Sequence, residues 1–155
     1  MPGPLQVFFD GFQPQFLYDP LESATSEFQR LLQVKGWHSN DHRYRAANRK
    51  FKNALIAQFN FNYGMDENSL TGWQALCEAL GKPVPTTVAQ GKKIVKGTHV
   101  NLVDLTEGRK HGRKIKTFKT IAKLKKYTWE TKKIFPKDDA KAGGLLKYLL
   151  RPILT

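Results

Sequence analysis

Lysine and arginine are the residues of this chain whose number and placement predict a chemistry. Residues 91–155 hold eighteen of them against five Asp and Glu, whereas residues 1–90 hold eight against eight. The whole net charge of +13 therefore falls in the C-terminal 65 residues. Such an asymmetry favours a polyanionic partner, because each cation placed against a phosphate releases counterions. We therefore expect this protein to bind nucleic acid.

The candidate phosphate contacts fall into three groups. Residues 108–114 contain no apolar side chain and two glycines, which is typical of an exposed basic loop. A second group lies on a helix expected over about 121–133, and a third recurs at i, i+4, i+7 on an earlier helix, where a solvated face explains it equally well. The predicted nucleic-acid-binding residues are Arg109, Lys110, Arg113, Lys114, Lys116, Lys119, Lys123, Lys126 and Lys133, extended by Arg45, Arg49 and Lys52.

Lysines greatly outnumber arginines in the basic half. A lysine acts as a point charge and lacks the bidentate fork with which arginine reads base edges, so we expect non-specific backbone binding. Trp129 stands among these lysines. It either stacks on a base at the outer face of its helix or packs against the last helix, and the sequence leaves both alternatives open.

One other interpretation of the charge remains open. A protein-interaction or scaffold module could dock an acidic partner on the same basic face or on the Phe-rich N-terminus. A membrane partner is not expected, because no run of about 18 apolar residues occurs. The single cysteine, Cys77, fits a reducing compartment, so we expect a nuclear or cytoplasmic location and a buried, unreactive thiol.

Enzymatic signatures are weak. His38 and His42 are four residues apart, but no second His or Cys cluster completes a zinc site. A hydrolase using His99 and Asp104 would need a cleft lined by both residues. Asp104, Glu107 and Glu130 could converge as metal-binding carboxylates only if the fold brings them together. Nothing here is sufficient to predict an enzyme, and we expect no cofactor and no metal.

The periodicity predicts an all-α, compact bundle of five or six helices with at most a small β-hairpin. Apolar residues at helical spacing indicate helices over 24–35, 41–62, 69–80, from Thr87 towards Lys96, over about 121–133, and one ending near Pro152. Gly36 is placed to end the first of these in a left-handed conformation. Residues 99–105 have neither a clean helical nor a clean strand period, so a buried turn of helix and a short strand both stay open there. The hairpin is expected to lead from the loop at 108–114 into residues 115–118.

Two regions are expected along the chain. Residues 1–22 combine dense aromatics with several Pro and Gly, which predicts an extended aromatic arm laid on the core, anchored by Phe8, Phe12 and Phe16. Residues 23–155 are expected to form a single helical domain, neutral to about residue 90 and strongly basic after it.

Several stretches together resemble a group of uncharacterised small fungal proteins. They are Glu27-Phe28-Gln29-Arg30-Leu31 with Gly36-Trp37, Phe59-Asn60 with Tyr63-Gly64, Trp73 to Cys77 ending in Leu80-Gly81, Thr98 to Leu105, and Ile134-Phe135-Pro136-Lys137 with Ala142 to Arg151. The similarity covers nearly the whole chain. It implies a fungal intracellular protein with one domain, and it supplies no activity and no functional residues.

Overall fold

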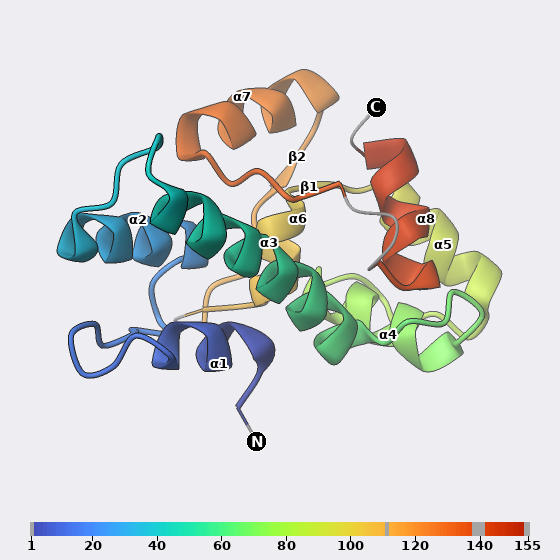
Figure 1. Ribbon diagram of the computed structural model, residues 1–155. Coiled ribbons are helices and arrows are strands. Elements are labelled where there is room, and N and C mark those ends of the chain that lie inside the picture. Colours follow the sequence, from blue (N-terminus) through green and yellow to red (C-terminus); the bar gives the residue numbers. More distant parts are fainter. Residues whose placement is uncertain (1, 111, 138–141, 154–155) are drawn as a thin grey trace.

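The computed structural model describes residues 2–110, 112–137 and 142–153 and is mostly helical (Figure 1). The described residues form eight helices: α1 (Pro4–Asp10), α2 (Ala24–Lys35), α3 (His42–Tyr63), α4 (Leu70–Ala79), α5 (Val88–Lys96), α6 (Leu102–Glu107), α7 (Ile121–Thr131) and α8 (Gly144–Ile153). Two short strands, β1 (His99–Val100) and β2 (Thr117–Phe118), form an antiparallel sheet. The helical class is confirmed. The expected five or six helices become eight because α1 was not predicted and because residues 99–105, where a turn of helix and a short strand were both open, contain the start of α6 after the short strand β1.

Local signals determine where the predicted helices begin and end. The Ser23 hydroxyl accepts a hydrogen bond from the Ser26 amide at the start of α2, and Gly36 ends that helix with a φ of 68°. The Asp41 carboxylate accepts from the Arg43 amide at the start of α3. Such contacts satisfy backbone groups that have no partner inside the helix, so these boundaries are visible in the sequence.

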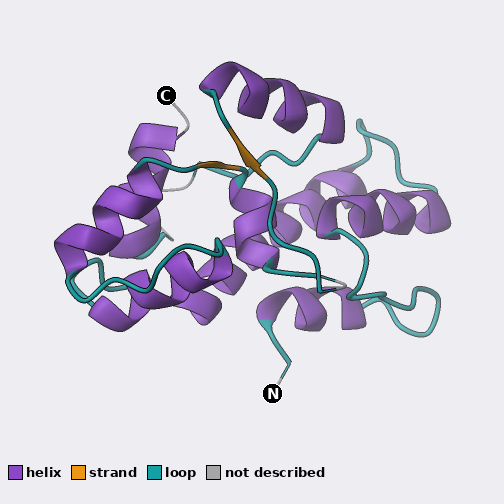
Figure 2. Ribbon diagram, turned by 180° about the vertical axis from the view of Figure 1, so that it is seen from behind, coloured by secondary structure: helices purple, strands orange, loops and turns teal. Residues whose placement is uncertain are grey.

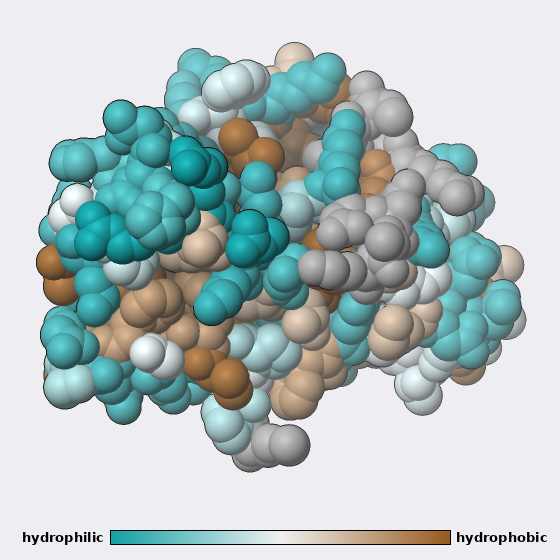
Figure 3. Space-filling view, viewed as in Figure 1, coloured by the Kyte–Doolittle hydropathy of each residue, from teal (hydrophilic) through white to brown (hydrophobic). Residues whose placement is uncertain are grey.

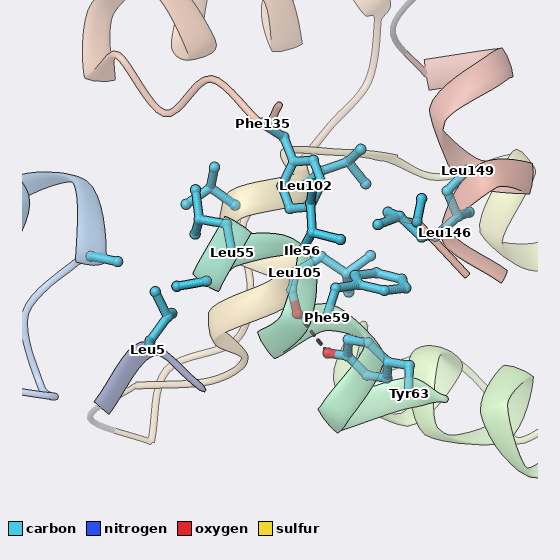
Figure 4. Close-up of a cluster of buried hydrophobic side chains, with 14 of the residues drawn as sticks. Leu5, Leu55, Ile56, Phe59, Tyr63, Leu102, Leu105, Phe135, Leu146 and Leu149 are labelled. Atoms are coloured by element: carbon cyan, nitrogen blue, oxygen red, sulfur yellow. Dashed lines mark hydrogen bonds between the residues drawn. The ribbon is translucent and has the colours of Figure 1, made fainter. Parts of the chain in front are cut away.

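The helix α3 is the centre of the molecule. Its 22 residues extend for about 33 Å, and α1, α4, α6 and α8 pack around it (Figure 1). Leu55, Ile56 and Phe59 point from α3 into the aliphatic part of the core, opposite Leu102 of α6 and Leu146 of α8 (Figure 4). The Tyr63 hydroxyl donates a 2.6 Å hydrogen bond to the Leu105 carbonyl, which ties α3 to α6.

The N-terminal arm packs on the core as expected, but it is not extended over residues 4–10. Residues 4–10 form α1, because Pro4 occupies the first helical turn, where its missing amide hydrogen costs nothing. Of the three expected anchors, Phe16 is buried while Phe8 and Phe12 are half-buried; Phe9 is buried as well. These rings join an aromatic cluster with α2 and α3, in which Phe28 and Phe51 stack with ring centroids 4.5 Å apart.

The region around residues 99–118 differs from the predicted hairpin. The two strands pair His99 with Phe118 and Val100 with Thr117, but α6 and a long connection lie between them. The change from strand to helix occurs at Asn101, whose side-chain oxygen accepts from the amides of Val103 and Asp104 at 2.9 and 3.1 Å. A single capping side chain thus resolves the segment that the hydrophobic period left undecided.

The close packing of α5 on α4 depends on a glycine. Gly91 is buried, and a Cβ atom at this position would lie 2.6 Å from Cβ of Trp73. In sequence Gly91 only weakens a helix. In the fold it lets the backbone of α5 approach the indole of α4.

Candidate nucleic-acid interface

Five of the predicted basic residues gather around one cavity. The connection between α6 and β2 runs across the face opposite that of Figure 1 (Figure 2), and together with α6 and α7 it borders an open cavity of about 540 Å³. We call this space the basic cavity. Its lining contains Lys110, Arg113, Lys114, Lys116 and Lys133, together with Asp104, Glu107, Tyr127, Ser23, Gly108 and Ile115. Five cations and two carboxylates give this lining a net charge of +3.

One of the five cations is neutralised inside the fold. Lys133 Nζ lies 2.8 Å from Asp104 Oδ1 and donates to the Tyr127 hydroxyl at 2.9 Å, while that hydroxyl donates to Asp104 Oδ2 at 2.5 Å. Burial alone lowers the pKa of Lys133, but the hydrogen bonds to Asp104 and Tyr127 outweigh it and the pKa is raised. Burial and the bond to Asp104 raise the pKa of Tyr127. The Lys133 charge is therefore committed to Asp104.

A second cation is neutralised in the same way. Lys110 Nζ lies 2.6 Å from Glu107 Oε1, which also accepts from the Ala24 amide at 2.7 Å. Only 4% of the Glu107 side chain is exposed, and burial raises the pKa of its carboxyl group. This pair joins the end of α6 to the start of α2.

Arg109 also makes contacts within the fold. Its guanidinium donates to the carbonyl oxygens of Glu78 and Ala79, at 3.0 and 3.4 Å. These carbonyls belong to the last turn of α4, where a cation is favourable. Of the residues expected in the basic loop, Arg113 and Lys114 are exposed.

The lysines of α7 and the residues just before it remain near the surface. Lys116 Nζ lies 5.3 Å from the ring centroid of Tyr127 and 5.7 Å from that of Phe118. Lys119, Lys123 and Lys126 are exposed, and Lys126 lies 3.8 Å from Glu130 one turn along the helix. An exposed pair of this kind holds its charges only weakly.

Trp129 does not pack against the last helix. Its side chain is 74% exposed, so the burial alternative is wrong. Beside it lies a small cavity of about 130 Å³, which we call the Trp129 pocket. Its walls come from β1 and α6, from α7 and from the segment after it: Val100, Asn101, Leu102, Ile121, Leu124, Lys125, Thr128, Trp129, Lys133, Ile134 and Phe135.

The basic stripe on α3 borders a third space, of about 410 Å³, which we call the α3 groove. The groove is lined by Arg45, Asn48, Arg49, Lys52, Asn53 and Ile56 of α3, with Pro136 and Lys137 opposite. Four of these residues are cations, and within the described ranges no carboxylate lines the groove. Arg45 also donates to the Asn40 carbonyl at 3.0 Å. The helical spacing of Arg45, Arg49 and Lys52 was visible in the sequence. Lys137 and Asn48 of the groove, and Lys125 of the Trp129 pocket, were not among the predicted binding residues.

The catalytic and metal hypotheses receive no geometric support. Asp104 lines the basic cavity, but His99 is not among the residues that line it. In the part of the chain that the structure describes, no group of three or more His, Cys, Asp or Glu is placed to hold a metal ion. Cys77 is buried, as expected, and burial raises the pKa of its thiol.

No family model, no curated protein and no solved structure matches this chain. The resemblance to small fungal proteins therefore stays a prediction. Among the helices of the described residues, none combines the length and apolar character that a membrane span requires.

Proposed function

We propose that this protein binds nucleic acid non-specifically, through contacts of its basic C-terminal half with the phosphate backbone. The main support is the basic cavity, where the connection from α6 to β2 brings five cations together with a net charge of +3. Two of them are paired with Asp104 and Glu107. The other three, Arg113, Lys114 and Lys116, have no ion-pair partner among the described residues.

The chemistry of these groups favours a backbone contact over a base-specific one. Lysine ammonium groups attract phosphate without defined geometry, and Lys119, Lys123 and Lys126 extend the basic surface along α7. Because such binding releases counterions, its affinity must fall steeply with salt. A buried thiol at Cys77 accords with a nuclear or cytoplasmic location.

Salt titration of binding tests this proposal. We expect a short labelled duplex of mixed sequence to bind at about 50 mM salt, with log affinity falling linearly as log salt rises. Arg113→Ala with Lys114→Ala should lower the steepness of that line by about 2, since two phosphate contacts are lost. The matched control removes two exposed lysines that border none of the three cavities, Lys82→Ala with Lys93→Ala, and should leave the line unchanged. Absence of binding at about 50 mM salt would exclude the function.

A protein-interaction module docking an acidic partner is the second candidate. It is favoured by three apolar side chains that stay exposed on the basic side of the molecule: Trp129 at 74%, Ile134 at 58% and Ile121 at 40%. Exposed apolar groups rimmed by charge often mark protein interfaces. A partner that remains bound after nuclease treatment, and is lost when Trp129 is changed to Ala, would support this candidate.

A further inference from the structure

The α3 groove and the Trp129 pocket are neighbours along a single stretch of chain. After α7 the chain turns back and passes between that helix and α3 (Figure 1). Ile134 and Phe135 of this stretch line the Trp129 pocket, and the next two residues, Pro136 and Lys137, line the α3 groove. Figure 3 shows the same face: a small hydrophobic patch lies between α7 and α3, and hydrophilic side chains gather below it over α3 and α2.

We infer that this face binds single-stranded nucleic acid, with an unpaired base on Trp129 and in its pocket and the neighbouring phosphates along the α3 groove. This inference rests on the proposed function and specifies the class of nucleic acid that the protein binds. Bases of a duplex are stacked inside the helix, whereas those of a single strand can turn outward onto an aromatic side chain.

The pocket offers an apolar surface and few free polar groups. The Asn101 amide nitrogen already donates to Thr128 Oγ1 at 3.1 Å and to the Lys133 carbonyl at 2.9 Å, and its oxygen caps α6. Lys133 points to Asp104, and only Lys125 remains as a cation in the lining without an ion-pair partner in the described part. Such walls contact the face of any base without reading its edge, so recognition is tolerant of sequence.

The groove supplies the charge that the phosphates need. Arg45, Arg49 and Lys52 follow each other at helical spacing, which places them over roughly 10 Å of the α3 axis. Lys137 faces them from the other wall. Within the described lining no carboxylate is present and no ion pair holds these four cations, so no ion pair among the described residues must break when phosphate enters. Lys110 and Lys133 of the basic cavity differ, because each is paired with a carboxylate.

The arrangement of charge favours single-stranded nucleic acid over an acidic peptide as the ligand of this face. The groove carries four cations, and the pocket that adjoins it along residues 134–137 carries an exposed indole. This succession of charge and aromatic surface matches a chain that repeats phosphate and base. An acidic peptide could satisfy the cations, and it is retained as an outcome of the test.

The test compares labelled oligonucleotides of about 20 residues in deoxy and ribo form with a duplex of the same length. Trp129→Ala should weaken single-strand binding about tenfold, whereas Trp129→Phe should stay within about threefold because its ring still stacks. Duplex affinity should change less than about twofold. Since Trp129 is 74% exposed, its replacement should leave the thermal unfolding curve unchanged.

The groove is tested in parallel. Arg49→Ala with Lys52→Ala should lower the steepness of the salt line for a single strand by about 1.4, as expected for two lost phosphate contacts. The pair Lys82→Ala with Lys93→Ala removes the same charge and should leave it unchanged.

The outcomes separate this inference from the proposed function. If both nucleic acids bind with steep salt dependence while Trp129→Ala leaves single-strand affinity unchanged, the inference is wrong and the proposed function stands. If single-strand binding depends on Trp129 but not on Arg113 and Lys114, the inference stands and the basic cavity is not the interface. Binding of an acidic peptide that requires Trp129, with no single-strand binding, would overturn the inference in favour of a protein partner.

Discussion

The basic cavity and the α3 groove carry similar numbers of cations but differ in what holds them. In the cavity, Lys133 and Lys110 lie against Asp104 and Glu107, both of which are largely buried. In the groove, Arg49 and Lys52 project from a helix whose lining holds no carboxylate among the described residues. The first pair of lysines joins α6 to α7 and α2, whereas the second pair contributes little to the packing of the fold.

This difference teaches that a count of Lys and Arg overestimates the charge available to a ligand. A cation paired with a buried carboxylate must lose that partner before it can serve a phosphate, and the carboxylate would then remain buried without compensation. The cations of the groove can exchange water and counterions for phosphate directly. We therefore expect stability and binding to respond to different lysines.

Replacement of Lys133 gives the largest expected effect. Lys133→Ala leaves Asp104 buried without its cation, so the free energy of unfolding should fall by about 2 kcal/mol. That value is reduced from the cost for a fully buried pair because the two side chains retain 17% and 13% exposure. Urea denaturation measures the change, and the steepness of the salt line for nucleic acid should stay the same.

Lys52→Ala is the matched control for Lys133. It should leave the urea midpoint unchanged and lower the steepness of the single-strand salt line by about 0.7. If instead Lys133→Ala keeps full stability and lowers the salt dependence of nucleic-acid affinity, then Lys133 contacts phosphate. The distinction between paired cations in the basic cavity and unpaired cations in the α3 groove then fails.

Glu107 gives a smaller effect that depends on pH. Burial raises the pKa of its carboxyl group, so between the unfolded and the folded pKa the folded protein binds more protons. Its contribution to stability is thus lost as pH rises through that window. Glu107→Gln removes this titration, so the stability of the variant relative to the wild type should increase as pH rises above the unfolded pKa of about 4.3. Urea denaturation at several pH values measures it, and a difference that is independent of pH would contradict the assignment.

Arg109 gives the smallest effect. Arg109→Ala removes two hydrogen bonds to the end of α4 at an exposed position, which should lower the free energy of unfolding by about 0.5 kcal/mol. The nucleic-acid affinity of Arg109→Ala should stay within about twofold of the wild type. Arg113→Ala should instead keep the free energy of unfolding and weaken nucleic-acid binding. Weaker binding by Arg109→Ala at full stability would place Arg109 in the interface after all.

Helices with local start and stop signals could be predicted from the sequence. The bounds of α2 are those expected, because Ser23 and Gly36 act on neighbouring backbone groups. The element α1 could not be found by treating proline only as a helix breaker, since Pro4 is harmless in a first turn. The α6 helix could not be assigned from hydrophobic period either, since it is short and buried on several sides.

The candidate interface was predicted only in part. The cations of residues 108–133 and the i, i+4, i+7 stripe on α3 follow from residue type and spacing. The sequence does not show which of these cations are paired with carboxylates. Asp104 and Lys133, for example, are 29 residues apart and meet only when α7 packs beside α6. The exposure of Trp129 was equally undecided, since its helix presents lysines and apolar residues on overlapping faces.

The sequence by itself determined the helical class, the ends of most helices and the charge of the C-terminal half, because these depend on side chains a few residues apart. The tertiary structure decided which cations are committed to carboxylates and which remain at the surface. It also decided that the stretch after α7 lines both the Trp129 pocket and, two residues further on, the α3 groove. These outcomes depend on contacts between residues distant in sequence, and such contacts exist only once the buried apolar faces of the helices have packed together.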